Sequence, residues 1–100
     1  MIVIAGVISI DGAQTDAVTA AANTMRAATL EEDACYEYRF SFAIDDPNKV
    51  LIFEEWRDQE ALNAHFATPH MAAFQQAMAG FVTAAPSVSR YEVTSKGPLR

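Results

Sequence analysis

The chain begins with a predicted strand over residues 2–10, and hydrophobic residues occupy both faces of this strand. Ile4 and Ile8 would point one way and Val3 and Val7 the other, because successive side chains alternate across a strand. A strand that is apolar on both faces must be covered on both faces. This first segment therefore predicts a second layer beyond the helices that the chain itself supplies.

Residues 14–30 have the periodicity of an amphipathic helix. Val18, Ala22 and Met25 fall on one face, while Asp16 and Arg26 fall on the opposite face. We expect this helix to pack on the sheet through its apolar stripe.

Aromatic and polar residues alternate over residues 35–44, which predicts a second strand. Tyr36, Tyr38 and Phe40 would share one face of it. Turn-forming residues fill positions 45–49. The apolar segment 50–56 then follows as the partner strand of a hairpin.

The segment after this hairpin predicts two short helices, over 59–67 and 69–79. Asp58 can accept hydrogen bonds from the free N–H groups of the first turn. Thr68 and Pro69 should end the first helix and begin the second, because threonine is a good N-cap and proline fits the first helical position.

A last strand over 87–95 makes the predicted order of elements β-α-β-β-α-β. This order is typical of an α+β, ferredoxin-like sandwich, in which helices cover one face of a four-stranded antiparallel sheet. We expect one domain over residues 1–100, with a loose tail at 96–100. The other sheet face would expose more apolar surface than a monomer tolerates, so we expect a homodimer that packs sheet on sheet as an α+β barrel. A ligand pocket would then lie between the sheet and the helices.

The charge balance excludes some classes of partner. Thirteen acidic against seven basic residues give a net charge of -6, which argues against nucleic acid and against an anionic membrane surface. Cys35 is the only cysteine, so no intrachain disulfide is possible. No basic leader precedes the first apolar residues, and we expect a cytoplasmic protein.

Two histidines are candidates for chemistry. His65 lies at the margin of an apolar helix face, where it could be a half-buried structural residue or a proton acceptor in a pocket. His70 follows five residues later; on one continuous helix the two rings would lie roughly 140° apart. No cysteine, and no acidic residue at metal-ligand spacing, accompanies them, so no metal site is expected.

The third strand ends on further polar groups. Trp56 could be core packing or a pocket wall whose indole N–H is directed at a ligand. Tyr38 is most simply a sheet-face residue. Glu54 or Glu55 could orient a histidine, although a solvated pair is the commoner outcome.

These residues together resemble a known family. The third strand and the helices after it look like the signature of the antibiotic-biosynthesis-monooxygenase (ABM) domain, and the predicted order of elements matches from end to end. The resemblance is carried by Phe53-Glu54-Glu55-Trp56, Asp58, Ala61-Leu62, His65-Phe66, Thr68-Pro69-His70 and Phe74. Cys35 and Tyr38 also resemble the family's second strand, but Asp33-Ala34 replaces its usual proline-glycine turn.

The resemblance implies a homodimer and oxidation of a quinol or polyphenol by O₂, with no cofactor and O₂ as co-substrate. His65 would accept the proton and Trp56 would orient the ring. The expected binding residues are Phe53, Phe66, His70, Phe74 and Tyr38. A haem-degrading branch of this fold is disfavoured, because Val7 and Phe74-Gln75 stand where an asparagine and an iron-ligating histidine would be needed. A binding module for phenolic metabolites, and an isomerase or degradative enzyme for a small oxygenated signalling molecule, remain alternatives.

Overall fold

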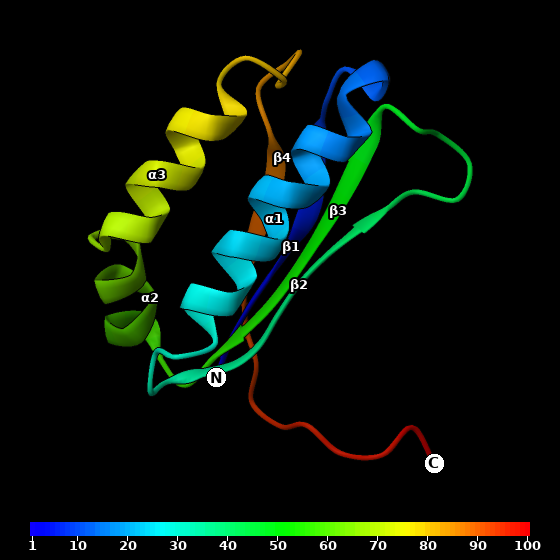
Figure 1. Cartoon of the computed structure of the whole chain (residues 1–100). Coiled ribbons are helices and arrows are strands. Elements are labelled where there is room, and N and C mark those ends of the chain that lie inside the picture. The colour runs from blue at the N-terminus through cyan, green and yellow to red at the C-terminus, as the bar shows by residue number, and fades with distance from the viewer.

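The computed structural model describes all residues, 1–100. Four strands form one antiparallel sheet in the order β2-β3-β1-β4. The strands are β1 (Ile2–Ser9), β2 (Cys35–Phe42), β3 (Lys49–Trp56) and β4 (Ser87–Glu92). The helices are α1 (Thr15–Thr29), α2 (Gln59–Phe66) and α3 (Pro69–Met78), and a 3-10 turn at Gly12–Gln14 precedes α1. All three helices lie on one face of the sheet (Figure 1), which confirms the predicted ferredoxin-like α+β fold.

The predicted helix starts are also confirmed. The Asp58 carboxylate accepts from the backbone N–H of Ala61 at 2.9 Å and caps α2. Thr68 caps α3 by accepting from the N–H of Met71, while its own hydroxyl donates to the carbonyl of His65 at 2.7 Å. The break between the two helices is therefore fixed by side-chain hydrogen bonds.

The core lies between the sheet and the helices. Its larger cluster is Ile2, Ile4, Met25, Ala34, Tyr38, Ile52, Trp56, Ala61 and Leu62. The smaller cluster, near the other end of the strands, is Ile8, Ile10, Val18, Val50 and Met78. Alternate side chains along β1 and β3 enter both clusters, as the two-residue period of a strand requires, and Tyr38 of β2 joins the larger one.

The predicted alternation along β2 is wrong at its start. A register shift between Cys35 and Glu37 places one extra residue, Tyr36, between two successive cross-strand pairs. A bulge of this kind moves the residues on either side of it to different faces. Tyr36 is therefore 57% exposed, whereas Tyr38 is 1% exposed and packs under the helices.

Gly6 allows β4 to approach β1 closely. The two strands pair Gly6 with Val88. A Cβ atom at position 6 would meet the carbonyl oxygen of Ser87 and would lie 2.5 Å from Cα of Val88. Only glycine fits this position without a shift of the β4 backbone.

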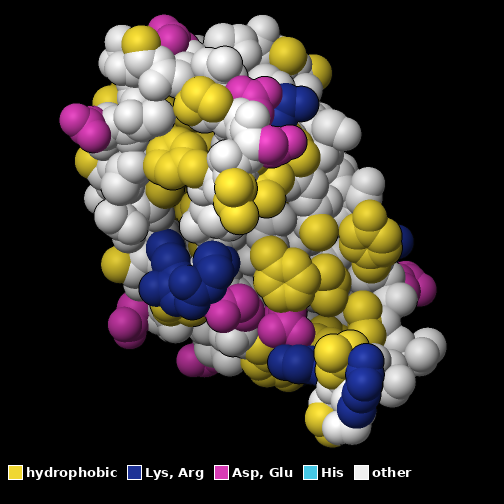
Figure 2. Space-filling view, turned by 90° about the vertical axis from the view of Figure 1, so that its right-hand side faces the viewer, with side chains coloured by type: hydrophobic (Ala, Val, Ile, Leu, Met, Phe, Trp, Pro, Cys, Tyr) yellow, Lys and Arg dark blue, Asp and Glu magenta, His cyan; other side chains and the backbone are white.

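The sheet face away from the helices is apolar and open. Leu51, Phe53 and Tyr91 are 40%, 43% and 52% exposed on it. Figure 2 shows hydrophobic side chains gathered on this side of the molecule, with charged side chains among and around them. Near one end, Lys96 pairs with Glu55 at 3.3 Å. No helix is both long enough and apolar enough to cross a membrane.

Candidate functional site

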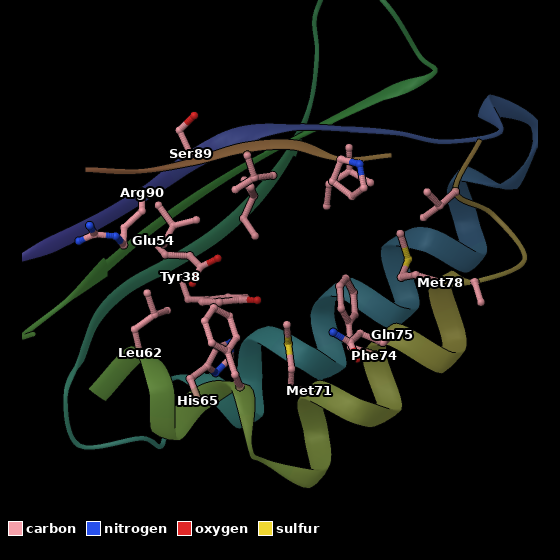
Figure 3. Close-up of a pocket in the computed structure, with 18 of the residues that line it drawn as sticks. Tyr38, Glu54, Leu62, His65, Met71, Phe74, Gln75, Met78, Ser89 and Arg90 are labelled. Carbon is pink, nitrogen blue, oxygen red and sulfur yellow. The ribbon is translucent and has the colours of Figure 1, made fainter. Parts of the chain in front are cut away.

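A cavity of about 540 Å³ lies between the sheet and the pair α2 and α3. Its walls are mostly apolar side chains from β1, β3, β4 and both helices, including Ile4, Ile52, Leu62, Met71, Phe74 and Met78. Figure 3 shows Tyr38 and Glu54 reaching the space from the sheet, opposite His65, Met71 and Phe74 from the helices. The strand β4 borders the cavity, and all of its residues are exposed, so the cavity opens along this edge.

Glu54 brings a carboxyl group into this apolar space. Its side chain lies on the helix-facing row of β3 and is 5% exposed. Its Oε1 accepts a hydrogen bond of 2.8 Å from the indole Nε1 of Trp56. Burial raises the pKa of Glu54 to about 7, despite the opposing effect of the Trp56 hydrogen bond. Near neutral pH the cavity therefore contains a carboxyl group that can either give or take a proton.

His65 enters the cavity from the last turn of α2. Its ring lies 4.6 Å from that of Trp56 and 5.5 Å from that of Tyr38, between centroids. Nδ1 is 2.8 Å from Oε2 of Glu32. Because a carboxylate only accepts, Nδ1 carries the proton and Nε2 has the free lone pair. Burial lowers the pKa of His65, against the raising effect of Glu32, which favours the neutral imidazole.

Several polar atoms in this region have no partner within the chain and are free for a ligand. The only enclosed side-chain nitrogen or oxygen without a partner is Oγ1 of Thr29. The hydroxyl of Tyr38 and Nε2 of His65 also have no partner within the chain, so both must retain contact with solvent. Both side chains line the cavity, which is where that contact is available.

A second arrangement surrounds Glu32, in the loop after α1. The same oxygen, Oε2, is 2.8 Å from Nδ1 of His65 and 2.8 Å from Nε2 of His70. Glu32 thus joins the end of α2 to the start of α3 and fixes the tautomer of His65. The predicted break at Pro69 brings the two imidazoles together, so the angle expected for one continuous helix does not apply.

The chemistry available in the cavity is that of proton transfer in a largely apolar space. A neutral imidazole, a carboxyl group that titrates near neutrality and a phenol hydroxyl all reach it. The site therefore offers the ring face of Phe74 for packing and three groups that can form hydrogen bonds.

The family model for "Antibiotic biosynthesis monooxygenase" matches residues 1–77. The chain belongs to this family. The matched segment includes Tyr38, Glu54 and His65, and β4 lies beyond it. The resemblance seen in the sequence is thereby confirmed.

Curated relatives of this ABM chain include proteins with and without a named activity. An uncharacterized protein of Synechocystis sp. is 27% identical over 98 residues, which are 98% of this chain and 67% of that protein. The probable quinol monooxygenase YgiN of Escherichia coli is 33% identical over 61 residues. That match covers 53% of this chain and 59% of YgiN, less than two thirds of its length.

Solved structures agree with the fold. A crystal structure described as an antibiotic biosynthesis monooxygenase has a TM-score of 0.87 at 22% identity, covering 95% of this chain and 100% of the other. A protein from Mycobacterium tuberculosis has a TM-score of 0.86 at 20% identity, covering 97% and 98%. At these identities the likeness supports the fold alone.

Four of the residues expected at the site line the cavity of this ABM domain: His65, Tyr38, Phe66 and Phe74. Phe66 is 56% exposed, so it lies at the rim rather than deep inside. The structure thus brings together side chains from β2, α2 and α3 that are far apart in the sequence.

Three other expected residues lie elsewhere. Phe53 points to the open sheet face, because its neighbours Ile52 and Glu54 face the helices. Trp56 is wholly buried, and its N–H is directed at Glu54 instead of at a ligand. His70 contacts Glu32 and borders a surface groove between α1 and α3, outside the cavity.

Sequence reasoning missed Glu32 as a site residue, and it considered Glu54 only as a residue that could orient a histidine. The position of Glu54 on the same strand row as Val50 and Ile52 was a usable signal, because that row must face the helices. Glu55 is buried as well, on the other face, so the pair is not solvated as expected. No local signal marked Glu32, which lies 33 residues from His65 in the sequence.

Proposed function

We propose that this protein is a cofactor-independent monooxygenase that oxidises a quinol or polyphenolic small molecule with O₂. One observation carries the proposal: Nε2 of His65, unpaired and on a neutral ring, borders an apolar cavity that a phenolic ring would fill. Family membership and the similarity to YgiN support the reaction class.

The substrate supplies the electrons in this scheme. Transfer of a phenolic proton to His65 leaves a phenolate, which is electron-rich enough to reduce O₂ by one electron. The resulting radical pair combines at a ring carbon. The proton held by His65 then returns to the ring-bound peroxide, and loss of water gives a hydroxyquinone. One oxygen atom of O₂ thus enters the product and the other leaves as water.

The residues of the cavity have distinct proposed roles. His65 accepts the proton, because its Nε2 is the free ring nitrogen. The Tyr38 hydroxyl donates to the developing oxyanion, and Glu54 bonds to a second hydroxyl of the substrate. The apolar walls, including Phe74, exclude water from the charged intermediate. Trp56 acts through Glu54, whose carboxyl it holds in place.

Oxygen uptake with a panel of quinols tests this proposal. The wild type should consume O₂ above the uncatalysed rate, and catalase should return none of it, because the second oxygen atom becomes water rather than hydrogen peroxide. His65→Ala should lower the rate by about 10²-fold or more, as expected for loss of a proton acceptor. Asn63→Ala, on the exposed side of the same helix, is the matched control.

Two outcomes would contradict the proposal. One is uptake that persists in a folded His65→Ala variant, which would remove the assigned proton acceptor. The other is thermal stabilisation by phenolic ligands without any oxygen uptake, which would identify a binding module instead of an enzyme.

A further inference from the structure

We propose that Glu32, His65 and His70 form a binding site for a divalent transition-metal ion, with Zn²⁺ as the best-matched cation. One carboxylate and two imidazoles form a recognised ligand set for Zn²⁺. The three donor atoms, Oε2, Nδ1 and Nε2 in that order, all lie within 4.8 Å of one another.

The spacing of the donors suits a bound ion. Glu32 Oε2 is 2.8 Å from each imidazole nitrogen. Tetrahedral Zn²⁺ with ligands at 2.0–2.1 Å places its donors about 3.3 Å apart. Glu32 Oε2 therefore needs to move back by about half an ångström from each nitrogen, which rotation of its side chain can supply. The two imidazole nitrogens lie within 4.8 Å of each other, and a turn of the more exposed His70 ring can bring them to the required spacing.

The fold holds the three ligands in place before any ion arrives. His65 and His70 lie on either side of the helix break at Thr68, whose hydroxyl bonds to the carbonyl of His65 and caps α3. The His65 side chain is 1% exposed and packs against Trp56, which fixes its ring. Little conformational entropy would be lost when an ion binds, because the ligands are already ordered.

The surroundings leave room for solvent ligands. The side chains of Glu32 and His70 are 18% and 23% exposed, so the cluster is reached from the surface and not only through the cavity. Imidazole ligands favour Zn²⁺ and its neighbours over Mg²⁺ and Ca²⁺, which prefer oxygen ligands throughout. The chain has only two histidines, so this is the one site in which two imidazoles can bind an ion. The lone cysteine, Cys35, donates to the carbonyl of Glu37 instead.

Metal binding would change Nε2 of His65 from a proton acceptor into a hydrogen-bond donor toward the cavity. The effect on turnover rests on the proposed function. Without an ion, Nδ1–H donates to Glu32 and Nε2 can accept a proton from a substrate. With an ion on Nδ1, the ring proton must be on Nε2, which then donates instead. Occupation of the site would therefore switch off the proton acceptor and inhibit oxygen uptake.

The test is Zn²⁺ binding to the metal-free protein, measured by calorimetry and by the shift in melting temperature. The wild type should bind one ion per chain. Glu32→Gln and His70→Ala should each weaken binding about tenfold or more. Glu31→Gln removes the same charge from the adjacent, exposed residue and should bind as the wild type does.

The site is refuted if the wild type binds no Zn²⁺, or if Glu32→Gln and His70→Ala bind it as tightly as Glu31→Gln. The consequence for turnover has a separate readout. Zn²⁺ should suppress oxygen uptake over the same concentration range in which it binds, and less effectively in His70→Ala. A protein that binds Zn²⁺ through these residues but never consumes oxygen would refute the proposed function and leave the metal site standing.

Discussion

At the scale of single residues, the carboxyl of Glu54 shows how the fold sets the chemistry of the cavity. It lies among apolar side chains, and the indole of Trp56 supplies its one hydrogen bond. Desolvation disfavours the charged form, which is why the pKa rises from 4.5 to about 7. A buried acid of this kind costs folding stability and is typical of functional sites.

Glu54 should make the protein less stable as the pH rises from about 4.5 to about 7. In this window the unfolded chain has lost the proton that the folded chain still holds, so the free energy of unfolding falls with pH. The shift corresponds to roughly 3 kcal/mol once both states are ionised. Glu54→Gln, whose amide oxygen can still accept from Trp56, should remove this loss.

Denaturant unfolding at about pH 4.5 and about pH 8 measures the effect. The variant should match the wild type at the lower pH and exceed its stability by up to roughly 3 kcal/mol at the higher one. Glu60→Gln, at the exposed start of α2, controls for the loss of one negative charge. If the free energy of unfolding changed with pH in the same way for the wild type and Glu54→Gln, the pKa of Glu54 would not be raised in the folded protein.

Of the two residues in the Glu32–His65 contact, the sequence predicts only His65. The helical spacing placed His65 beside an apolar face, and the structure finds it there. The partner of His65 could not be found, because Glu32 reaches it only through the packing of a loop against two helix ends. Pairings set by tertiary contact leave no local pattern in a sequence.

At the scale of elements, helix caps and hydrophobic patterns predict the bounds of most helices and strands. Caps at Asp58 and Thr68 predict the starts of α2 and α3. Apolar segments predict β1 and β3, and alternation predicts β2, each within two residues at both ends. The end of β4 was placed three residues too far along. The bulge at Tyr36 was not predicted, because an uninterrupted alternating pattern carries no sign of a register shift.

Gly6 is the position at which the sheet is least tolerant of a side chain. Gly6→Ala should destabilise the protein by about 1–3 kcal/mol, because its methyl group would press on the backbone of Ser87 and Val88 and force β4 away. Thermal or denaturant unfolding measures this. Gly97→Ala is the control, since a Cβ there meets nothing within 4 Å. Equal stability of the two variants would mean that β4 does not pack as closely as the structure shows.

At the scale of the whole molecule, the helices leave one sheet face uncovered. Phe53, Leu51 and Tyr91 are partly exposed on this face, and a patch of that kind is usually covered by another chain. We propose that two copies pack sheet against sheet, as the sequence suggests. Such a dimer would leave the cavity free, because the cavity lies on the helix side.

Phe53→Asp should convert this dimer to a monomer, because it places a charge in the middle of the apolar face. Phe66→Asp makes the same change at a residue that is 56% exposed on the helix side, and it should leave the dimer intact. Sedimentation equilibrium distinguishes the two variants. A wild-type protein that is monomeric at micromolar concentration would contradict the proposed dimer.

The central claim is that a phenolic molecule binds in the cavity between the sheet and α2 and α3. Two of the four methionines, Met71 and Met78, line this cavity, whereas Met1 and Met25 do not. The most direct test is NMR of the protein labelled with ¹³C in its methionine methyl groups. It is titrated with 1-naphthol, a flat phenolic molecule, in the absence of O₂ so that no oxidation occurs. The methyl signals of Met71 and Met78 should shift together and saturate. Shifts confined to Met1 or Met25, or no saturable shift at all, would place the ligand elsewhere and contradict the claim.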